Sequence, residues 1–132
     1  MSTQNFKWYQ ETILYVITIN SYVKFGITTN WENRAKAYQK ELDGLTYRFI
    51  KQINFNHRWQ AELIEQVVKW RLRRWVAYGR HEWIELPIQP VLDCINETIG
   101  ELSKEFSKHQ FIHKCGNERW DYYRQISEYY FK

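Results

Sequence analysis

Residues 14–38, LYVITINSYVKFGITTNWENRAKAY, decide the fold, because they predict a β-hairpin followed by a helix. Residues 12–19 are rich in β-branched and aromatic side chains, as is typical of a half-buried strand. Asn20 and Ser21 supply turn residues, whose side chains can bond the nearby backbone. Residues 22–28 form a second extended run, so the two runs should pair as a hairpin.

A helix is expected directly after the hairpin. Gly26 interrupts the second run, which indicates either a bulge or a backbone that another group approaches closely. Asn30 can cap the helix, and Glu32 in its first turn suits the positive end of the helix dipole. Arg34 and Tyr38 are four residues apart on this helix, so their side chains share one face. That face should lie opposite Tyr15 and Lys24 of the two strands.

A second, longer helix is expected over residues 57–78, capped by Asn56 and stopped by Gly79. Glu65 lies near the centre of its apolar stripe, whereas Glu62 lies on the polar side. The stripe consists of Ala61, Ile64, Val68, Leu72 and Trp75. A carboxylate that faces the core is costly unless it is paired or holds a cation. The periodicity leaves two interpretations of Glu65 open, a buried ion pair with a residue such as Arg34, or a metal site.

The remaining elements complete a small α+β fold. Residues 45–55 alternate weakly and predict a third strand, and residues 82–86 form a short extended piece. Residues 88–108 and 118–130 have helical spacing. We therefore expect a three-stranded, mostly antiparallel sheet flanked by helices.

Two parts of this one domain are expected, a core over residues 1–86 and a helical C-terminal extension over residues 87–132. In the last helix, the side that carries Trp120, Tyr123 and Ile126 or Ser127 should pack on the core.

Composition excludes several classes of protein. Hydrophobic residues make up 44% and aromatic residues 18% of the 132 residues, which excludes a disordered chain. No apolar run reaches the roughly 20 residues that a membrane helix needs. The N-terminus lacks the apolar segment of a signal peptide, so a cytoplasmic protein is expected. Cys94 and Cys115 have no metal-ligand spacing, which favours reduced, structural cysteines.

Positive charge is concentrated in one segment of the chain. The net charge is +4, and residues 69–80, KWRLRRWVAYGR, contain five basic residues, three large aromatic residues and no acid. Basic side chains can hold phosphates, and exposed aromatic rings can stack on bases. The alternative is an amphipathic helix with a solvated basic face and buried tryptophans. The candidate nucleic-acid-binding residues are Arg71, Arg73, Arg74 and Arg80.

The hairpin motifs resemble a known family. LYV at 14–16, KFG at 24–26 and Arg34 are similar to the signatures of the GIY-YIG nuclease superfamily, and more narrowly to its phage and bacterial branch with a KIG-type second signature. The offset from Lys24 to Arg34 matches that family, although the first signature lacks its glycine. Tyr38 falls where members carry a second His or Tyr. The resemblance covers roughly residues 12–86.

This resemblance implies a metal-dependent endonuclease that hydrolyses the phosphodiester bonds of DNA. Glu65 would be the single metal ligand and hold Mg²⁺ or Mn²⁺. Arg34 would donate to the phosphate, and Tyr15 would orient or deprotonate the attacking water. Lys24 would replace the second signature tyrosine, and Tyr38 would position the water or the phosphate. All five side chains are then expected to line one cleft.

Two other functions stay open at this point. The first is a catalytically inactive module of the GIY-YIG fold that binds nucleic acid or takes part in a phage–host interaction. The second is a helical adaptor that binds protein through the aromatic tail at residues 118–131, ERWDYYRQISEYYF. Taken singly, each candidate residue has an ordinary structural role, such as packing by a tyrosine or a surface position for a cation.

Overall fold

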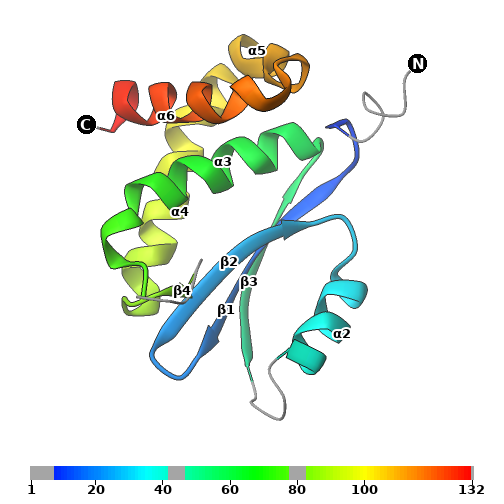
Figure 1. The fold of residues 1–132 in the computed structure, drawn as a ribbon, viewed down its shortest axis with the longest axis vertical. Coiled ribbons are helices and arrows are strands. Elements are labelled where there is room, and N and C mark those ends of the chain that lie inside the picture. Colours follow the sequence, from blue (N-terminus) through cyan, green and yellow to red (C-terminus); the bar gives the residue numbers. More distant parts are fainter. Residues whose placement is uncertain (1–7, 42–46, 78–82, 132) are drawn as a thin grey trace.

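A computed structural model describes residues 8–41, 47–77 and 83–131 (Figure 1). Some sequence predictions lie outside these residues, namely the helix stop at Gly79, the candidate Arg80, and the first residues of the extended runs 45–55 and 82–86. Within the described ranges, no helix combines the length and the apolar character needed to cross a membrane.

A four-stranded antiparallel sheet lies at the centre, with the strand order β3-β1-β2-β4. The α+β class is confirmed, but the sheet has one strand more than the three expected. The extra strand arises because part of the short extended piece pairs with the free edge of β2. The strands are β1 (Thr12–Ile19), β2 (Tyr22–Thr28), β3 (Arg48–Phe55) and β4 (Trp83–Ile84).

The predicted hairpin is confirmed at both of its strands. Ile19 pairs with Tyr22, so Asn20 and Ser21 alone make the turn. Asn20 has a φ of 54°, in the left-handed region that asparagine tolerates better than most residues. A register shift lies between Val16 and Ile17 where β1 meets β3, and not at Gly26.

Helices cover both faces of the sheet. Helix α2 (Trp31–Glu41) lies on one side, and its N-terminus is capped as predicted, since the Asn30 side-chain oxygen accepts a hydrogen bond from the Asn33 amide at 3.1 Å (Figure 1). The other side carries the larger helices α3, α4 and α6, of which α4 and α6 both contact α3. Their bounds are α3 (Arg58–Arg71), α4 (Ile88–Leu102) and α6 (Arg119–Tyr130). Between α4 and α6 come the short α5 (Phe106–His109) and the 3₁₀ turns Ser103–Glu105, Gln110–Lys114 and Gly116–Glu118.

Helix α3 is shorter than the expected helix over residues 57–78. It starts after His57 instead of Asn56, and it gives way to a 3₁₀ turn at Arg73–Trp75. The chain then becomes extended because its backbone bonds the β4 segment. The Glu85 amide donates to the Trp75 carbonyl at 2.7 Å, and the Ala77 amide donates to the Trp83 carbonyl at 2.9 Å. Pairing with an edge strand thus replaces the last turns of the predicted helix.

The C-terminal helices complete the core that the sheet begins. Val91, Ile95 and Tyr123 are buried in the same hydrophobic cluster as Leu14 and Val16 of β1. On α6, the expected burial of Tyr123, Ile126 and Ser127 is confirmed. The expectation for Trp120 was wrong, because its side chain is 44% exposed.

Glu62 corrects the sequence interpretation of α3. It was expected on a solvent-facing side, yet it is only 4% exposed because α6 covers that side. Its Oε1 accepts hydrogen bonds from Arg119 Nε at 2.7 Å and from the Tyr123 hydroxyl at 2.8 Å. Burial and this neighbouring carboxylate raise the pKa of Tyr123 well above its ordinary value. A buried, bonded carboxylate therefore joins α3 to α6.

The substitution Glu62→Gln should lower the free energy of unfolding by about 3 kcal/mol, because it leaves the guanidinium of Arg119 without its charged partner. Urea denaturation of the purified protein measures this change. The matched control is Glu128→Gln, whose carboxylate pairs with Arg124 on the exposed surface and should contribute less than about 1 kcal/mol. Equal effects of the two substitutions would contradict a structural role for the buried pair.

Candidate functional site

Two tyrosines meet between the sheet and α2. The hydroxyls of Tyr15 on β1 and Tyr38 on α2 lie 2.5 Å apart, so one of them donates a hydrogen bond to the other. The two rings meet edge to face, with their centroids 5.9 Å apart. Tyr15 is 2% and Tyr38 is 1% exposed. The sequence prediction that these residues face each other is confirmed.

Gly26 makes room for this pair. It is the register partner of Tyr15 on β2. A Cβ atom at Gly26 would lie 2.6 Å from the Tyr15 hydroxyl oxygen and 2.9 Å from the ring carbon that carries it, so the Tyr15 ring would have to shift to admit it. Of the two predictions for Gly26, a bulge and a close approach, the close approach is the correct one.

Lys24 places a positive charge beside the tyrosines. It is two residues from Gly26 along β2 and therefore lies on the same face of the sheet as Tyr15. Its Nζ is 5.2 Å from the centroid of the Tyr38 ring and 5.2 Å from that of Trp83 on β4. This geometry is within reach of a cation–π interaction with both rings.

Further aromatic side chains surround the pair, and no sequence pattern had predicted their place in the site. The ring of Trp31 lies 5.1 Å from that of Tyr15, and the ring of Tyr47 lies 5.8 Å from that of Tyr38, centroid to centroid. Arg34 is exposed on α2, one helical turn before Tyr38. Arg34 thus presents its charge to solvent at the margin of an aromatic cluster.

Glu65 lies on the other side of the sheet. It belongs to α3, whose buried side chains pack with Leu14 and Val16, the neighbours of Tyr15 that point to the opposite face. Glu65 is 8% exposed, and its carboxylate lies 3.8 Å from Lys69 Nζ. The helix that carries Glu65 therefore covers the face of the sheet opposite the tyrosine pair, whereas the sequence prediction placed all five candidate residues in one cleft.

The chemistry around Glu65 does not fit a metal ion beside the tyrosines. Its carboxylate also accepts a hydrogen bond from the Gln66 side chain at 3.1 Å. One carboxylate with several waters can hold Mg²⁺, but here the sheet separates that carboxylate from Tyr15 and Tyr38. Among the residues that the structure describes, no group of three His, Cys, Asp or Glu side chains could hold a metal.

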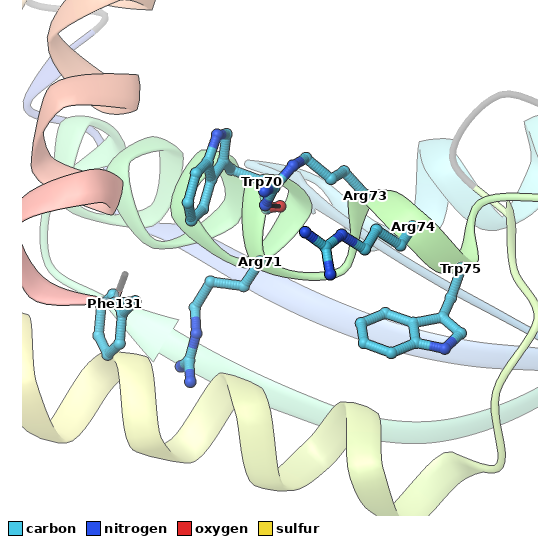
Figure 2. Close-up of a pocket in the computed structure, with 6 residues that line it drawn as sticks. All are labelled: Trp70, Arg71, Arg73, Arg74, Trp75 and Phe131. Atoms are coloured by element: carbon cyan, nitrogen blue, oxygen red, sulfur yellow. Dashed lines mark hydrogen bonds between the residues drawn. The ribbon is translucent and has the colours of Figure 1, made fainter.

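Arg71, the first arginine of the basic segment, is used in packing. Its guanidinium donates to Thr98 Oγ1 at 2.8 Å and to the Glu97 carboxylate at 3.2 Å. It also lies 4.0 Å from the centroid of the Phe131 ring. Figure 2 shows the side chain pointing toward Phe131 and α4, away from Arg73. Arg71 thus links α3 to α4, a role that the sequence did not indicate.

The next two arginines lie on the surface. Arg73 lies over the Trp70 ring, 3.8 Å from its centroid, and donates to the Trp70 carbonyl at 2.7 Å. Arg74 and Trp75 are exposed beside it, with Trp75 at 44%. Trp75, which the sequence analysis placed on the apolar stripe of the helix, is therefore exposed, contrary to the alternative of buried tryptophans. These residues border a hollow of about 250 Å³ (Figure 2).

A comparison with models of known protein families identifies the family of this chain. The model of the T5orf172 domain matches residues 12–99, two thirds of the sequence. The chain belongs to the T5orf172 family. This family is GIY-YIG-like and is associated with phage nucleases. No curated protein and no solved structure matches the sequence.

The T5orf172 match runs from β1 to within α4 and includes both tyrosines, Lys24 and the whole of α3. It ends before α6. The carboxylate of Glu62 therefore lies inside the matched region, while its partner Arg119 lies outside.

The substitution Gly26→Ala should displace the Tyr15 ring and lower the free energy of unfolding by about 1–3 kcal/mol, the usual cost of overpacking. The control is Gly100→Ala on α4, where an added Cβ meets nothing within 4 Å. That change should stabilise by about 0.5–1 kcal/mol, since alanine suits a helix better than glycine. Chemical denaturation checks both values, and a Gly26→Ala protein as stable as the parent would refute the close contact.

Proposed function

We propose that this T5orf172 protein is a metal-dependent endonuclease that hydrolyses phosphodiester bonds of DNA. One observation carries the proposal: the hydroxyls of Tyr15 and Tyr38 touch beside Lys24, at positions where the sequence resembles the GIY-YIG family. Three separate elements, β1, β2 and α2, supply these side chains. The membership of the chain in the T5orf172 family adds support, because this family is associated with phage nucleases.

The tyrosine pair suits proton transfer. When Tyr38 donates to the Tyr15 oxygen, it stabilises negative charge there, and the Lys24 ammonium nearby acts in the same direction. Once Tyr15 has lost its proton, the phenolate with that support can take a proton from a water molecule, which attacks phosphorus while the P–O bond to the leaving deoxyribose oxygen breaks. Arg34 would donate to the phosphate from the surface of α2, where a charge-assisted hydrogen bond grows stronger as negative charge develops.

A divalent cation, Mg²⁺ or Mn²⁺, belongs to the proposal as a requirement of the reaction. When bound, it would neutralise charge on the phosphate. Glu65 is the ligand that the resemblance implies, but its ion pair with Lys69 on the far side of the sheet does not fit that role. The roles of Tyr15, Lys24, Arg34 and Tyr38 are therefore proposed independently of Glu65.

A second candidate function is a nucleic-acid-binding module without catalysis. The burial of both tyrosines favours it, because a hydroxyl that is 1–2% exposed along with its ring cannot meet a phosphate unless the surrounding rings move. The exposed arginines at the end of α3 would support binding in either case.

Nicking of supercoiled plasmid DNA tests the proposal. The parent protein should nick DNA with Mg²⁺ or Mn²⁺ and stop in EDTA. Tyr15→Phe and Tyr38→Phe should each slow cleavage by about 10²–10⁴-fold, the usual contribution of a general acid or base. The control is Tyr129→Phe, which removes a hydroxyl from a side chain that is 78% exposed and should leave the rate unchanged. A parent that binds DNA and never cleaves it would favour the binding module, and a Tyr15→Phe variant at full rate would end the assignment.

Glu65→Gln tests the metal ligand separately. Because Glu65 lies across the sheet from the tyrosines, we expect the variant to cleave DNA at a rate within about threefold of the parent. The corresponding change in activation free energy is smaller than the roughly 1.4 kcal/mol of a tenfold change in rate. The same plasmid assay measures it, together with DNA binding in EDTA. A loss by orders of magnitude with binding retained would instead identify Glu65 as the ligand of the cation.

A further inference from the structure

Cations and tryptophans recur along one side of α3 and of the turn that follows it. The spacing is three and four residues, which places these side chains in one row. The row consists of Gln66, Lys69, Trp70, Arg73 and Arg74. It lies on the opposite side of the helix from the apolar residues Ala61, Ile64 and Val68, which are fully buried.

Two hollows follow this row, each with a volume of about 250 Å³. Trp70 borders both, so the hollows adjoin. The first is the one at the end of α3 that Arg73, Arg74 and Trp75 border (Figure 2). The second is bordered by Gln66, Lys69, Trp70, Trp120, Tyr123 and Arg124. Helix α6 thus adds two aromatic rings and a cation to the row, and we call the whole surface the Trp–Arg strip.

The Trp–Arg strip is positive and aromatic. None of the described residues that border the two hollows is acidic. Three of the bordering cations have carboxylate partners: Lys69 pairs with Glu65 at 3.8 Å, Arg71 with Glu97 at 3.2 Å and Arg124 with Glu128 at 3.2 Å. Arg73 and Arg74 are exposed, so at least these two charges face solvent.

The tryptophans are accessible as well. Trp75 and Trp120 are each 44% exposed and lie at opposite ends of the strip, with Trp70 between them. Trp70 and Trp120 each carry a guanidinium over the ring, Arg73 at 3.8 Å and Arg119 at 4.3 Å from the centroids. Such contacts hold the rings in fixed orientations before any ligand arrives.

We infer that the Trp–Arg strip binds single-stranded DNA, with phosphates on the exposed arginines and bases stacked on Trp75 and Trp120. A row of cations selects a polyanion, and aromatic platforms select one whose bases are unpaired, because a duplex keeps its bases stacked on one another. This inference rests on the proposed function for the choice of DNA. It adds that the strand lies on the α3 side of the sheet, away from the tyrosine pair.

Fluorescence anisotropy with a labelled oligothymidylate, and with a duplex of equal length, tests the inference. Binding is measured in EDTA in a Tyr15→Phe background, so cleavage plays no part. The parent should prefer the single strand. Trp75→Ala should weaken binding by about 5–100-fold, the range expected when one stacked base loses its platform. The matched control is Tyr129→Ala, which removes a ring that is 78% exposed and outside both hollows.

A second variant keeps the test independent of folding defects. Arg74→Gln should reduce the slope of log affinity against log salt by about 0.7, one released counterion. Lys104→Gln, at a side chain that is 72% exposed and outside the strip, should leave the slope unchanged. Equal affinity for duplex and single strand, or equal losses in Trp75→Ala and Tyr129→Ala, would overturn the inference. A protein that binds as expected and fails to nick plasmid would overturn only the proposed nuclease.

Discussion

The contact between the Tyr15 ring and the backbone of Gly26 determines which side chains lie on each face of the sheet. With the end of that ring placed against Gly26 of β2, its hydroxyl reaches the Tyr38 hydroxyl on α2. The alternation of side chains along β1 then sends Leu14 and Val16 to the opposite face, where the helices of the larger layer bury them. One short stretch of strand therefore divides the molecule into an aromatic side and an aliphatic side.

The aliphatic side depends on residues that are distant in sequence. Helix α3 touches the sheet, α4 and α6, so it is enclosed on three sides and can bury two carboxylates. Glu62 is matched by Arg119 and Tyr123 of α6, and Glu65 by Lys69 on its own helix. The last helix of the chain is thereby part of the core and does more than extend it.

The sequence predicted those features that local rules determine. The hairpin, its turn and the Asn30 cap follow from alternation and from side-chain bonds within a few residues. The end of α3 could not be predicted, because β4 competes for the backbone of the segment after Arg71. Periodicity identifies an apolar stripe but not the number of neighbours that a helix has, and Glu62 was misplaced for that reason. The site shows the same division: the tyrosines and Lys24 follow from strand and helix spacing, whereas the position of Glu65 depends on which face of the sheet α3 covers.

The bonds between the turn after α3 and β4 connect the two sides of the sheet. Trp75 is tied to Glu85 through the backbone, and β4 in turn pairs Trp83 with Lys24. The Lys24 ammonium group lies near the rings of both Trp83 and Tyr38. A backbone path therefore runs from Trp75 through β4 to the side chain that packs on Lys24 beside the tyrosine pair. If a ligand at Trp75 changed the affinity of a ligand at Lys24 through this path, the ligand at Lys24 would change the affinity at Trp75 by the same factor.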